Sequence, residues 1–220
     1  MGFDCAPENP IPQPGAPIPA FPLRRAPLKG KECNQPMDKK LPRSFYNRDT
    51  AKVARELLGK HLVHIVDGVE RRGRIVETEA YIGAHDLASH SSKGITPRTQ
   101  IMYGPPGRAY VYLIYGMHHC MNVVTEQEGH GAAVLLRALE PIANIEANTK
   151  GPGLLCRAMG IDKRLNGHDL LKDDFYIAEP LWKETFSIVE RPRIGVAYAG
   201  HWAHEELRFY IEGNAFISKK

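Results

Sequence analysis

The sequence predicts a single α+β domain, and three observations lead to that fold class. Strand-like runs are joined by short local turns, of which Asp67-Gly68 is the clearest, and such turns favour antiparallel hairpins. Only two segments, residues 49–59 and 151–160, have the apolar spacing and the end signals of helices. Strands do not alternate with long helices, so a doubly wound parallel sheet is disfavoured.

The first predicted elements are a helix and a hairpin. Asp49 is placed to cap the helix, and Gly59 is placed to end it. The β-rich runs at residues 61–66 and 69–83 flank the Asp67-Gly68 turn, and together they predict two paired strands. Because side chains alternate along a strand, every second residue of the longer run faces the same side of the sheet.

The rest of the domain is predicted to contain mainly strands and loops. The expected elements are a loop over residues 83–108, a hairpin over 109–124 that turns at Tyr115-Gly116, a strand over 132–138, a helix over 151–160, and strands over 193–199 and 207–213. Gly151-Pro152 is typical of a helix start, and Gly160 is typical of a helix end.

The composition separates a proline-rich arm from this domain. The chain has 220 residues, of which 43% are hydrophobic and 25% charged, as is ordinary for a globular protein. Nine of its 17 prolines lie in the first 40 residues. We therefore expect residues 1–40 to form a disordered or polyproline-like arm and residues 41–220 to form the folded domain. Met37 resembles a natural start, and we expect residues 1–36 to be dispensable.

Several protein classes are disfavoured by the same sequence. No uncharged apolar stretch is long enough to span a membrane, and no basic segment leads into an apolar core as in a secretory signal. The four cysteines form no C-x-x-C pair, which argues against a disulfide scaffold and a cysteine zinc site. We expect a reducing compartment, which is the cytoplasm with its nucleoid in a bacterium or the nucleus in a eukaryote.

Histidines offer three candidate pairs of metal ligands. They are His85 with His90, His118 with His119, and His201 with His204. None has a third ligand at a recognisable spacing, and the H-E-x-x-H motif is absent. The sequence also has no P-loop, no G-x-G-x-x-G and no G-x-S-x-G motif. We expect no bound metal.

Two carboxylates on one face of a predicted strand are the first candidate for chemistry. Glu77, Glu79 and Tyr81 alternate in VETEAY, so all three share a face. Like charges in that arrangement repel each other, and a solvent-facing strand is one explanation. A second is a general base that takes a proton from water in a partly apolar cleft. A third is the acid and base pair of a glycosidase.

Aromatic and basic residues around the second predicted hairpin indicate nucleic acid as a partner. The tyrosines are Tyr103, Tyr110, Tyr112 and Tyr115, and the basic residues are Arg71, Arg72, Arg74, Lys93, Arg98, Arg108 and Arg137. Tyr115 is expected at the hairpin tip, where an exposed ring marks a binding surface. Phosphates bind basic groups, and rings stack on or wedge between bases. The formal net charge of +4 adds little to this inference.

Several segments together resemble the alkyladenine (3-methyladenine) DNA glycosylase family. They are, in order, RGRIVETEAYIG, DLASHSS with TPRTQIMY, AYVYLIYGMHHCMNVV, AVLLRALEP, GPGLLCRAMGI, and RPRIGV with LRFYIEGN. The resemblance runs from Ser44 to Ser218. It implies a compact mixed domain with a curved antiparallel sheet and a hairpin that enters the DNA minor groove. It also implies a monomeric enzyme of base excision repair that excises alkylated or deaminated purines from duplex DNA without a metal or organic cofactor.

The resemblance also implies roles for individual residues. Glu79 is expected to activate the attacking water. The remaining roles are base binding by Tyr81, His90, Tyr112, Asn122 and Leu135, water holding by Arg137, intercalation by Tyr115 and Met117, and DNA-backbone contact by Lys93 and Arg98. Asn122 is expected to reject the 2-amino group of guanine, and Glu77 is expected to be a structural neighbour. The aromatic walls favour a cationic base through cation–π attraction.

Three departures from the family pattern and two rival functions accompany this resemblance. The segment Pro141–Gly151 is short, and His118 and His119 replace expected aromatic residues. No lysine falls at a pocket position, so we expect a glycosylase without strand cleavage. One rival is a carbohydrate hydrolase that uses Glu77 and Glu79. The other is a damage-recognition module that flips bases without releasing them.

Overall fold

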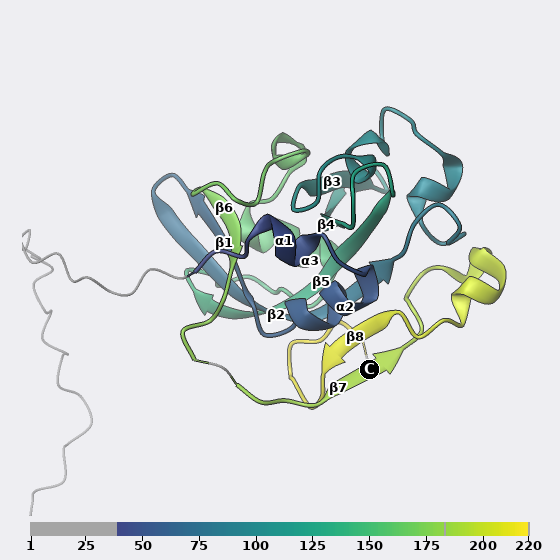
Figure 1. Ribbon diagram of the computed structural model, residues 1–220. Helices are drawn as coiled ribbons and strands as arrows, with labels where there is room; N and C mark the ends of the chain where they lie inside the picture. The colour runs from purple at the N-terminus through teal and green to yellow at the C-terminus, as the bar shows by residue number, and fades with distance from the viewer. Residues whose placement is uncertain (1–38, 183, 220) are drawn as a thin grey trace, which may run out of the picture. The chain divides into compact units, whose positions relative to one another are not determined.

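The computed structural model describes residues 39–182 and 184–219, and Figure 1 shows their arrangement. The strands are β1 (His61–Val66), β2 (Val69–Tyr81), β3 (Ala109–Ile114), β4 (His118–Thr125), β5 (Ala132–Ala143), β6 (Phe175–Ala178), β7 (Ile188–Arg191) and β8 (Arg208–Ile211). The α-helices are α1 (Arg43–Tyr46), α2 (Thr50–Leu57) and α3 (Pro152–Met159). Four short 3₁₀ helices are η1 (His90–Lys93), η2 (Gln100–Tyr103), η3 (Lys163–Leu165) and η4 (Ala197–Ala203).

The described strands form one curled antiparallel sheet. Its order is β3-β4-β5-β2-β1-β6, and β8 joins β2 and carries β7 on its other side. Few helices accompany the sheet, so the fold is mixed α+β as predicted (Figure 1). In this part of the chain, no helix is long and apolar enough to cross a membrane.

Local sequence signals produce the first elements as predicted. The Asp49 carboxylate accepts a hydrogen bond from the Lys52 backbone N–H at 2.8 Å, which satisfies a free donor at the start of α2. Asp67 and Gly68 have φ values of 51° and 76°, the left-handed pair that closes a two-residue hairpin. Tyr115 and Gly116, with φ values of 51° and 69°, lie in the three-residue turn between the paired residues Ile114 and His118 that closes the β3–β4 hairpin.

Strand β2 changes its partner along its length, and this change positions the carboxylates. Its first half pairs with β1, whereas its residues Glu77 to Glu79 pair with β8. Its other edge pairs with β5, with register shifts between Ile75 and Thr78. Such irregularities bend a strand and strengthen its twist. The end of β2 therefore leaves the β1–β6 side of the sheet and meets the C-terminal strands.

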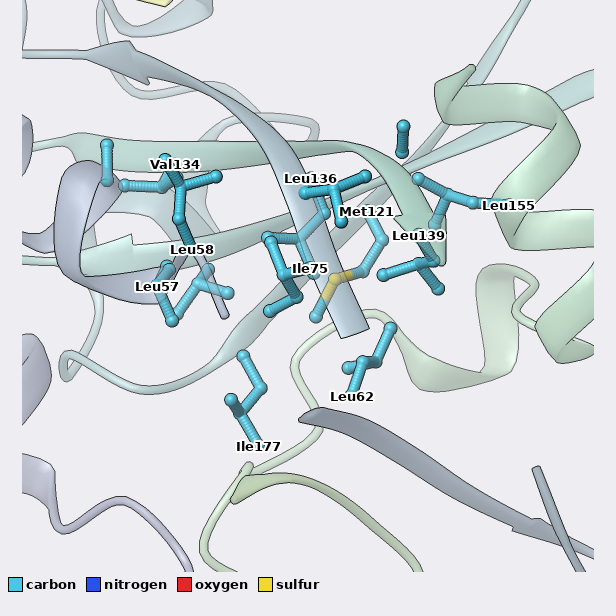
Figure 2. Packing of buried hydrophobic residues seen from close by; sticks show 14 of the residues in the cluster. Leu57, Leu58, Leu62, Ile75, Met121, Val134, Leu136, Leu139, Leu155 and Ile177 are labelled. Atoms are coloured by element: carbon cyan, nitrogen blue, oxygen red, sulfur yellow. The ribbon is translucent and has the colours of Figure 1, made fainter. Parts of the chain in front are cut away.

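The main hydrophobic core lies between the sheet and the helices. Leu57 of α2, Ile75 of β2, Leu136 and Leu139 of β5, and Leu155 of α3 are all fully buried (Figure 2). Full burial of one such side chain contributes about 1.5–3 kcal/mol. The core holds β2 and β5 together on one side and leaves their opposite face available for polar groups.

Some predicted elements differ from the structure. The strand expected at residues 193–199 is wrong, because Gly195 and Gly200 have left-handed φ values of 79° and 61° and the segment continues into η4. Strands β6 and β7, of four residues each, and helix α1 were not predicted. Strand β5 continues to Ala143 because it pairs with β2 from Tyr81 back to Arg72. Residues 1–38, which hold nearly all of the predicted proline-rich arm, lie outside the described residues.

Candidate active site

One row of side chains crosses five strands of the sheet. Tyr110 of β3 lies opposite Asn122 of β4, and Asn122 lies opposite Leu135 of β5. Leu135 also lies opposite Glu79 of β2, and Glu79 lies opposite Arg208 of β8. Residues directly opposite each other on paired strands project from the same face of a sheet. The register therefore gathers residues from distant parts of the sequence at one place.

A cavity of about 360 Å³ opens beside this row. Its lining includes seven of the predicted site residues, namely Tyr81, His90, Tyr112, Tyr115, Asn122, Leu135 and Arg137. It also includes Tyr110, Cys120, Ile194 and Tyr198. The volume lies in the range of small-molecule sites, and the aromatic lining suits a flat, apolar-faced ligand.

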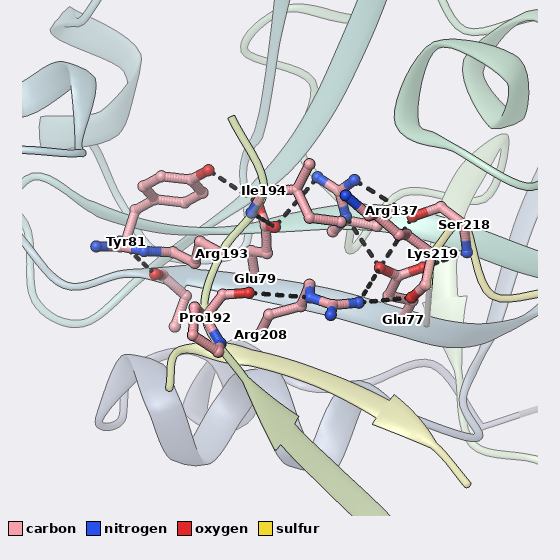
Figure 3. Close-up of polar contacts among 11 residues, drawn as sticks. Glu77, Glu79, Tyr81, Arg137, Pro192, Arg193, Ile194, Arg208, Ser218 and Lys219 are labelled. Carbon is pink, nitrogen blue, oxygen red and sulfur yellow. Dashed lines mark hydrogen bonds and ion pairs between the residues drawn. The ribbon is translucent and has the colours of Figure 1, made fainter. Parts of the chain in front are cut away.

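Glu79 is fully buried behind the cavity lining, and three donors hold it. Its Oε2 accepts from the Tyr81 hydroxyl at 2.9 Å, and its Oε1 accepts from the Ile194 backbone N–H at 2.7 Å. The Arg137 guanidinium lies 3.2 Å from Oε1 (Figure 3). All three donors belong to residues that line the cavity, so the carboxylate is fixed immediately behind it.

Glu77 is also fully buried, so a solvent-facing role for the two carboxylates is wrong. Its Oε1 accepts from Arg137 Nε and Arg208 Nη1, each at 3.1 Å, and from the Ser218 hydroxyl at 2.9 Å. The Ser218 backbone N–H donates to the other oxygen (Figure 3). A buried carboxylate needs such partners, because an unpaired buried charge is very unfavourable. Glu77 therefore anchors two arginines and the chain near Ser218.

Arg137 links the two carboxylates. Its Nε donates to Glu77, while its Nη1 reaches Glu79. Burial disfavours the charge, but Glu79 and Glu77 outweigh burial and raise the pKa of the Arg137 guanidinium. The side chain is held charged beside the cavity, where it can orient a polar group of a ligand or a water molecule.

The Tyr81 side of the cavity is braced by a buried ion pair. The Arg193 guanidinium lies 4.8 Å from the Tyr81 ring centre and makes two hydrogen bonds to the Asp86 carboxylate. Both charged side chains are fully buried. Burial, followed by the nearby Glu79 carboxylate, raises the pKa of Tyr81 far above its usual value. The Tyr81 hydroxyl therefore stays protonated and keeps donating to Glu79.

The opposite side of the cavity contains a cluster of aromatic rings that meet edge to face. The His90 and Tyr112 ring centres are 4.7 Å apart, and His90 Nδ1 lies 3.0 Å from the Tyr110 hydroxyl. Burial, with a smaller effect of Arg98, lowers the pKa of His90 to about 4. His90 is therefore neutral near pH 7 and presents an uncharged ring to the cavity.

The β3–β4 turn places Tyr115 at the edge of the cavity. Its side chain is 85% exposed although it is large and aromatic. Met117 follows at 70% exposure but does not line the cavity. A tyrosine with φ of 51° is uncommon, and here the left-handed turn directs the chain so that both residues stand at the hairpin tip. This pair forms an exposed apolar projection.

Lys93 is the last residue of η1, Arg98 lies on the loop that follows it, and both are exposed. Neither lines the cavity. The Arg98 guanidinium lies 4.9 Å from the centre of the Tyr112 ring.

The three histidine pairs were considered above as candidate metal ligands. Among the residues described by the structure, no three His, Cys, Asp or Glu side chains gather as a metal site would require.

A comparison with protein families identifies the family to which the chain belongs. The model of the family described as methylpurine-DNA glycosylase (MPG) matches residues 44–215, which include every strand of the sheet. The chain belongs to this family. Membership makes the protein a DNA repair glycosylase, a hydrolase of N-glycosyl bonds that acts on alkylated purines.

Individual relatives of this glycosylase agree with the family match. A protein of Legionella pneumophila (strain Corby) is 66% identical over 182 residues, which are 82% of this chain and 99% of the relative. Proteins of Anaeromyxobacter dehalogenans (strain 2CP-1) and Myxococcus xanthus are 55% and 51% identical over 181 residues. These matches cover 82% and 81% of this chain and 86% and 93% of those relatives. All three are named "Putative 3-methyladenine DNA glycosylase".

The glycosylase site also contains residues that the sequence reasoning missed. Cys120 lines the cavity, and alternation from Asn122 along one strand was a usable signal for it. Ile194 and Tyr198 line it from a segment that was predicted to be a strand. Arg208 reaches Glu77 from a strand whose pairing with β2 has no local sequence signal.

Proposed function

We propose that this 3-methyladenine DNA glycosylase hydrolyses the N-glycosyl bond with a water molecule activated by Glu79. The observation that carries the proposal is the Glu79 carboxylate, fully buried behind the aromatic cavity and held by the Tyr81 hydroxyl, the Ile194 N–H and Arg137. The proposed substrates are duplex DNAs that contain 3-methyladenine, 7-methylguanine, hypoxanthine or ethenoadenine. The damaged nucleotide is flipped out of the helix, and its base enters the cavity.

Extrusion of the nucleotide is unfavourable, and the exposed hairpin offsets part of that cost. Unstacking and unpairing cost roughly a few kcal/mol, and least at a damaged base. Tyr115 is the proposed wedge that fills the gap left in the duplex, with Met117 beside it. Tyr81, His90 and Tyr112 then enclose the base, and each good stacking contact contributes about 1–3 kcal/mol. Lys93 and Arg98 are the proposed backbone contacts at this edge.

The proposed chemistry uses one water and one carboxylate. Both Arg137 and the Ile194 N–H engage Oε1 of Glu79, which leaves Oε2, shared with Tyr81, for the water. The carboxylate takes a proton as the water oxygen bonds to C1′ of the deoxyribose. The C1′–N bond breaks, and its electron pair leaves with the base. The same negative charge stabilises the positive charge that develops on the sugar.

We propose that Asn122 excludes normal guanine from the cavity. Its Nδ2 donates to the Tyr110 backbone carbonyl at 3.1 Å, and the side chain is buried. The amide therefore has one orientation, and it occupies the space that the 2-amino group of guanine needs. No lysine lines the cavity among the described residues, so we expect no Schiff base with the sugar and no strand cleavage.

The proposed catalytic unit comprises residues 41–220. Residues 1–36 lie outside the part of the chain that the structure describes and outside the family match. A chain that begins at Met37 is expected to excise damaged bases at the rate of the full chain. Loss of activity in that shorter chain, with folding intact, would contradict the proposed boundary.

One assay separates the glycosylase from its rivals. Duplex DNA with a single hypoxanthine or ethenoadenine is incubated with the enzyme and then treated with alkali, which cuts the strand at an abasic site. We expect cleavage only after alkali, and we expect Glu79→Gln to abolish it while the protein still binds the lesion. Glu128→Gln, at an exposed position outside the cavity lining, is the control. Binding without base release by the unaltered protein would indicate the damage-recognition module instead.

A further inference from the structure

Both aromatic sides of the cavity carry a guanidinium group. Arg193 lies 4.8 Å from the ring centre of Tyr81, and Arg98 lies 4.9 Å from the ring centre of Tyr112. The two tyrosines line the cavity, whereas neither arginine does. Each ring therefore separates a positive charge from the space in which a base would lie.

The two guanidinium groups differ in how their charge is balanced. Arg193 is fully buried and paired with Asp86 through two hydrogen bonds, so its field is largely cancelled. Arg98 is exposed, and no carboxylate of the described residues lies within ion-pair distance of it. Of the two guanidinium groups beside the tyrosine rings, only that of Arg98 therefore keeps an unbalanced charge among the described residues.

The field of Arg98 reaches the groups that line the cavity. After the larger effect of burial, Arg98 contributes to the lowered pKa of His90. Burial raises the pKa values of Tyr110, Tyr112 and Cys120, and Arg98 opposes each of these increases. The Arg98 charge thus favours the anionic forms of the two tyrosines and the cysteine, and it disfavours the cationic form of His90. The same charge disfavours a cationic ligand in the cavity.

We propose that Arg98 is a specificity-determining residue that favours neutral damaged purines over cationic ones in the base cavity. The proposal rests on the function proposed above, because it concerns the base that enters the cavity. It reverses the expectation that the aromatic walls favour a cationic base: the outer face of the Tyr112 ring already carries a cation. Hypoxanthine and ethenoadenine are neutral bases of the favoured class, and 7-methylguanine and 3-methyladenine are cationic in DNA.

The expected size of the effect follows from the distances. A base stacked about 3.5 Å from the inner face of the ring lies roughly 8 Å from the guanidinium. A charge pair at that separation changes an equilibrium about twofold in bulk water and about thirtyfold at the effective dielectric constant of a protein surface. Removal of the Arg98 charge should therefore change the selectivity between cationic and neutral bases within that range.

The test compares two bases that share a shape and differ in charge. Duplexes carry either 7-methylguanine, stabilised by a 2′-fluoro sugar, or its neutral isostere 7-methyl-7-deazaguanine with the same sugar. Equilibrium dissociation constants are measured for both duplexes with the unaltered protein, Arg98→Met, Arg98→Lys and Lys93→Met. We expect Arg98→Met to shift the ratio of the two constants toward the cationic base by about two- to thirtyfold.

The other variants identify the cause of the shift. Arg98→Lys keeps the charge, and we expect it to keep most of the selectivity. Lys93→Met removes an equivalent charge from the same loop, so it should weaken both complexes equally and leave the ratio unchanged. An unchanged ratio in Arg98→Met, or equal shifts in Arg98→Met and Lys93→Met, would overturn the proposal. Excision of hypoxanthine by the unaltered protein is measured separately, so failure of the proposed function remains distinguishable.

Discussion

The Arg137 guanidinium lies 3.2 Å from the Glu79 carboxylate, and both side chains are buried beneath the aromatic cavity. Arg137 is itself held by Glu77, which also receives Arg208 and Ser218. The position of Glu79 thus depends on a second carboxylate that does not line the cavity. This arrangement gives Glu77 a positioning role that can be measured.

Substitution of Glu77 by Gln should lower both catalysis and stability. The charge shared by Arg137 and Arg208 disappears, and loss of one member of a buried ion pair costs about 3–5 kcal/mol when the partner stays charged. We expect urea unfolding to show a loss toward the low end of that range. The single-turnover rate of hypoxanthine excision should fall by at least about tenfold, because displacement of Arg137 disturbs the proposed water site.

Two control variants test this role of Glu77. Glu140→Gln removes a partly exposed carboxylate of the neighbouring strand, and it should cost less than about 1 kcal/mol with no effect on the rate. Ser218→Ala removes the hydroxyl that donates to Glu77 and accepts from Arg137, and it should cost about 1–2 kcal/mol. A Glu77→Gln protein that is less stable but excises at the normal rate would restrict Glu77 to a structural role.

Replacement of Tyr115 by Ser should weaken lesion binding more than it slows chemistry. The ring is 85% exposed at the hairpin tip, so its removal leaves the fold intact. Loss of one stacking contact predicts a decrease of about 1–3 kcal/mol in the free energy of lesion binding. Fluorescence anisotropy measures the affinity, and single-turnover kinetics at saturating enzyme measures the chemistry. Trp182→Ser, at an 82% exposed ring outside the cavity lining, is the control. Unchanged affinity in Tyr115→Ser would argue against the wedge.

Substitution of Asn122 by Ala should increase the release of normal guanine. The smaller side chain leaves room for the 2-amino group, and we expect an increase of about tenfold or more. Release of guanine from undamaged duplex DNA measures this change. Asn166→Ala is the matched control, because Asn166 also bonds the β3 backbone, at the Val111 N–H, yet does not line the cavity. Equal guanine release by both variants would indicate a general loosening of β3.

His90 should make the protein less stable as the pH falls below about 6.5. In the folded protein burial and then Arg98 lower the pKa of His90 to about 4, whereas the unfolded chain has the ordinary value. Between these two pH values the unfolded state binds more protons, so stability is greatest above the ordinary pKa and decreases toward the folded one.

Urea unfolding of the unaltered protein and of His90→Gln isolates this contribution. We expect the difference in stability between the two to change by less than about 1.4 kcal/mol per pH unit over this window, because His90 is partly exposed. The partly buried His61 and the buried His64, whose pKa values are also lowered, mainly by burial, are present in both proteins. A difference that is independent of pH would contradict the lowered pKa of His90.

Local signals in the sequence were sufficient for the parts of the fold that depend on local physics. Asp49, the Asp67-Gly68 turn and the alternation of Glu77 with Glu79 all predict their structural positions, because capping, left-handed turns and strand alternation act over a few residues. The resemblance to a family, rather than spacing, assigned roles to seven of the residues that line the cavity.

Contacts between distant segments could not be predicted from local sequence signals. The pairing of Glu79 with Arg208 depends on which strand reaches the free edge of β2, and no pattern within either strand specifies this. Ile194 was assigned to a strand because its neighbours are apolar, yet Gly195 bends the chain so that the Ile194 N–H donates to Glu79. The Arg193–Asp86 ion pair was missed because its members are separated by 107 residues.

The bond between Glu77 and Ser218 also has a consequence for biosynthesis. These partners are 141 residues apart, so the ribosome makes the carboxylate long before the serine that helps to hold it. Until residue 218 has emerged, Glu77 lacks two of its donors and Arg137 lacks its full anchorage. On the proposed mechanism, a nascent chain that already displays the Tyr115 hairpin therefore does not excise bases efficiently until residue 218 has joined the fold.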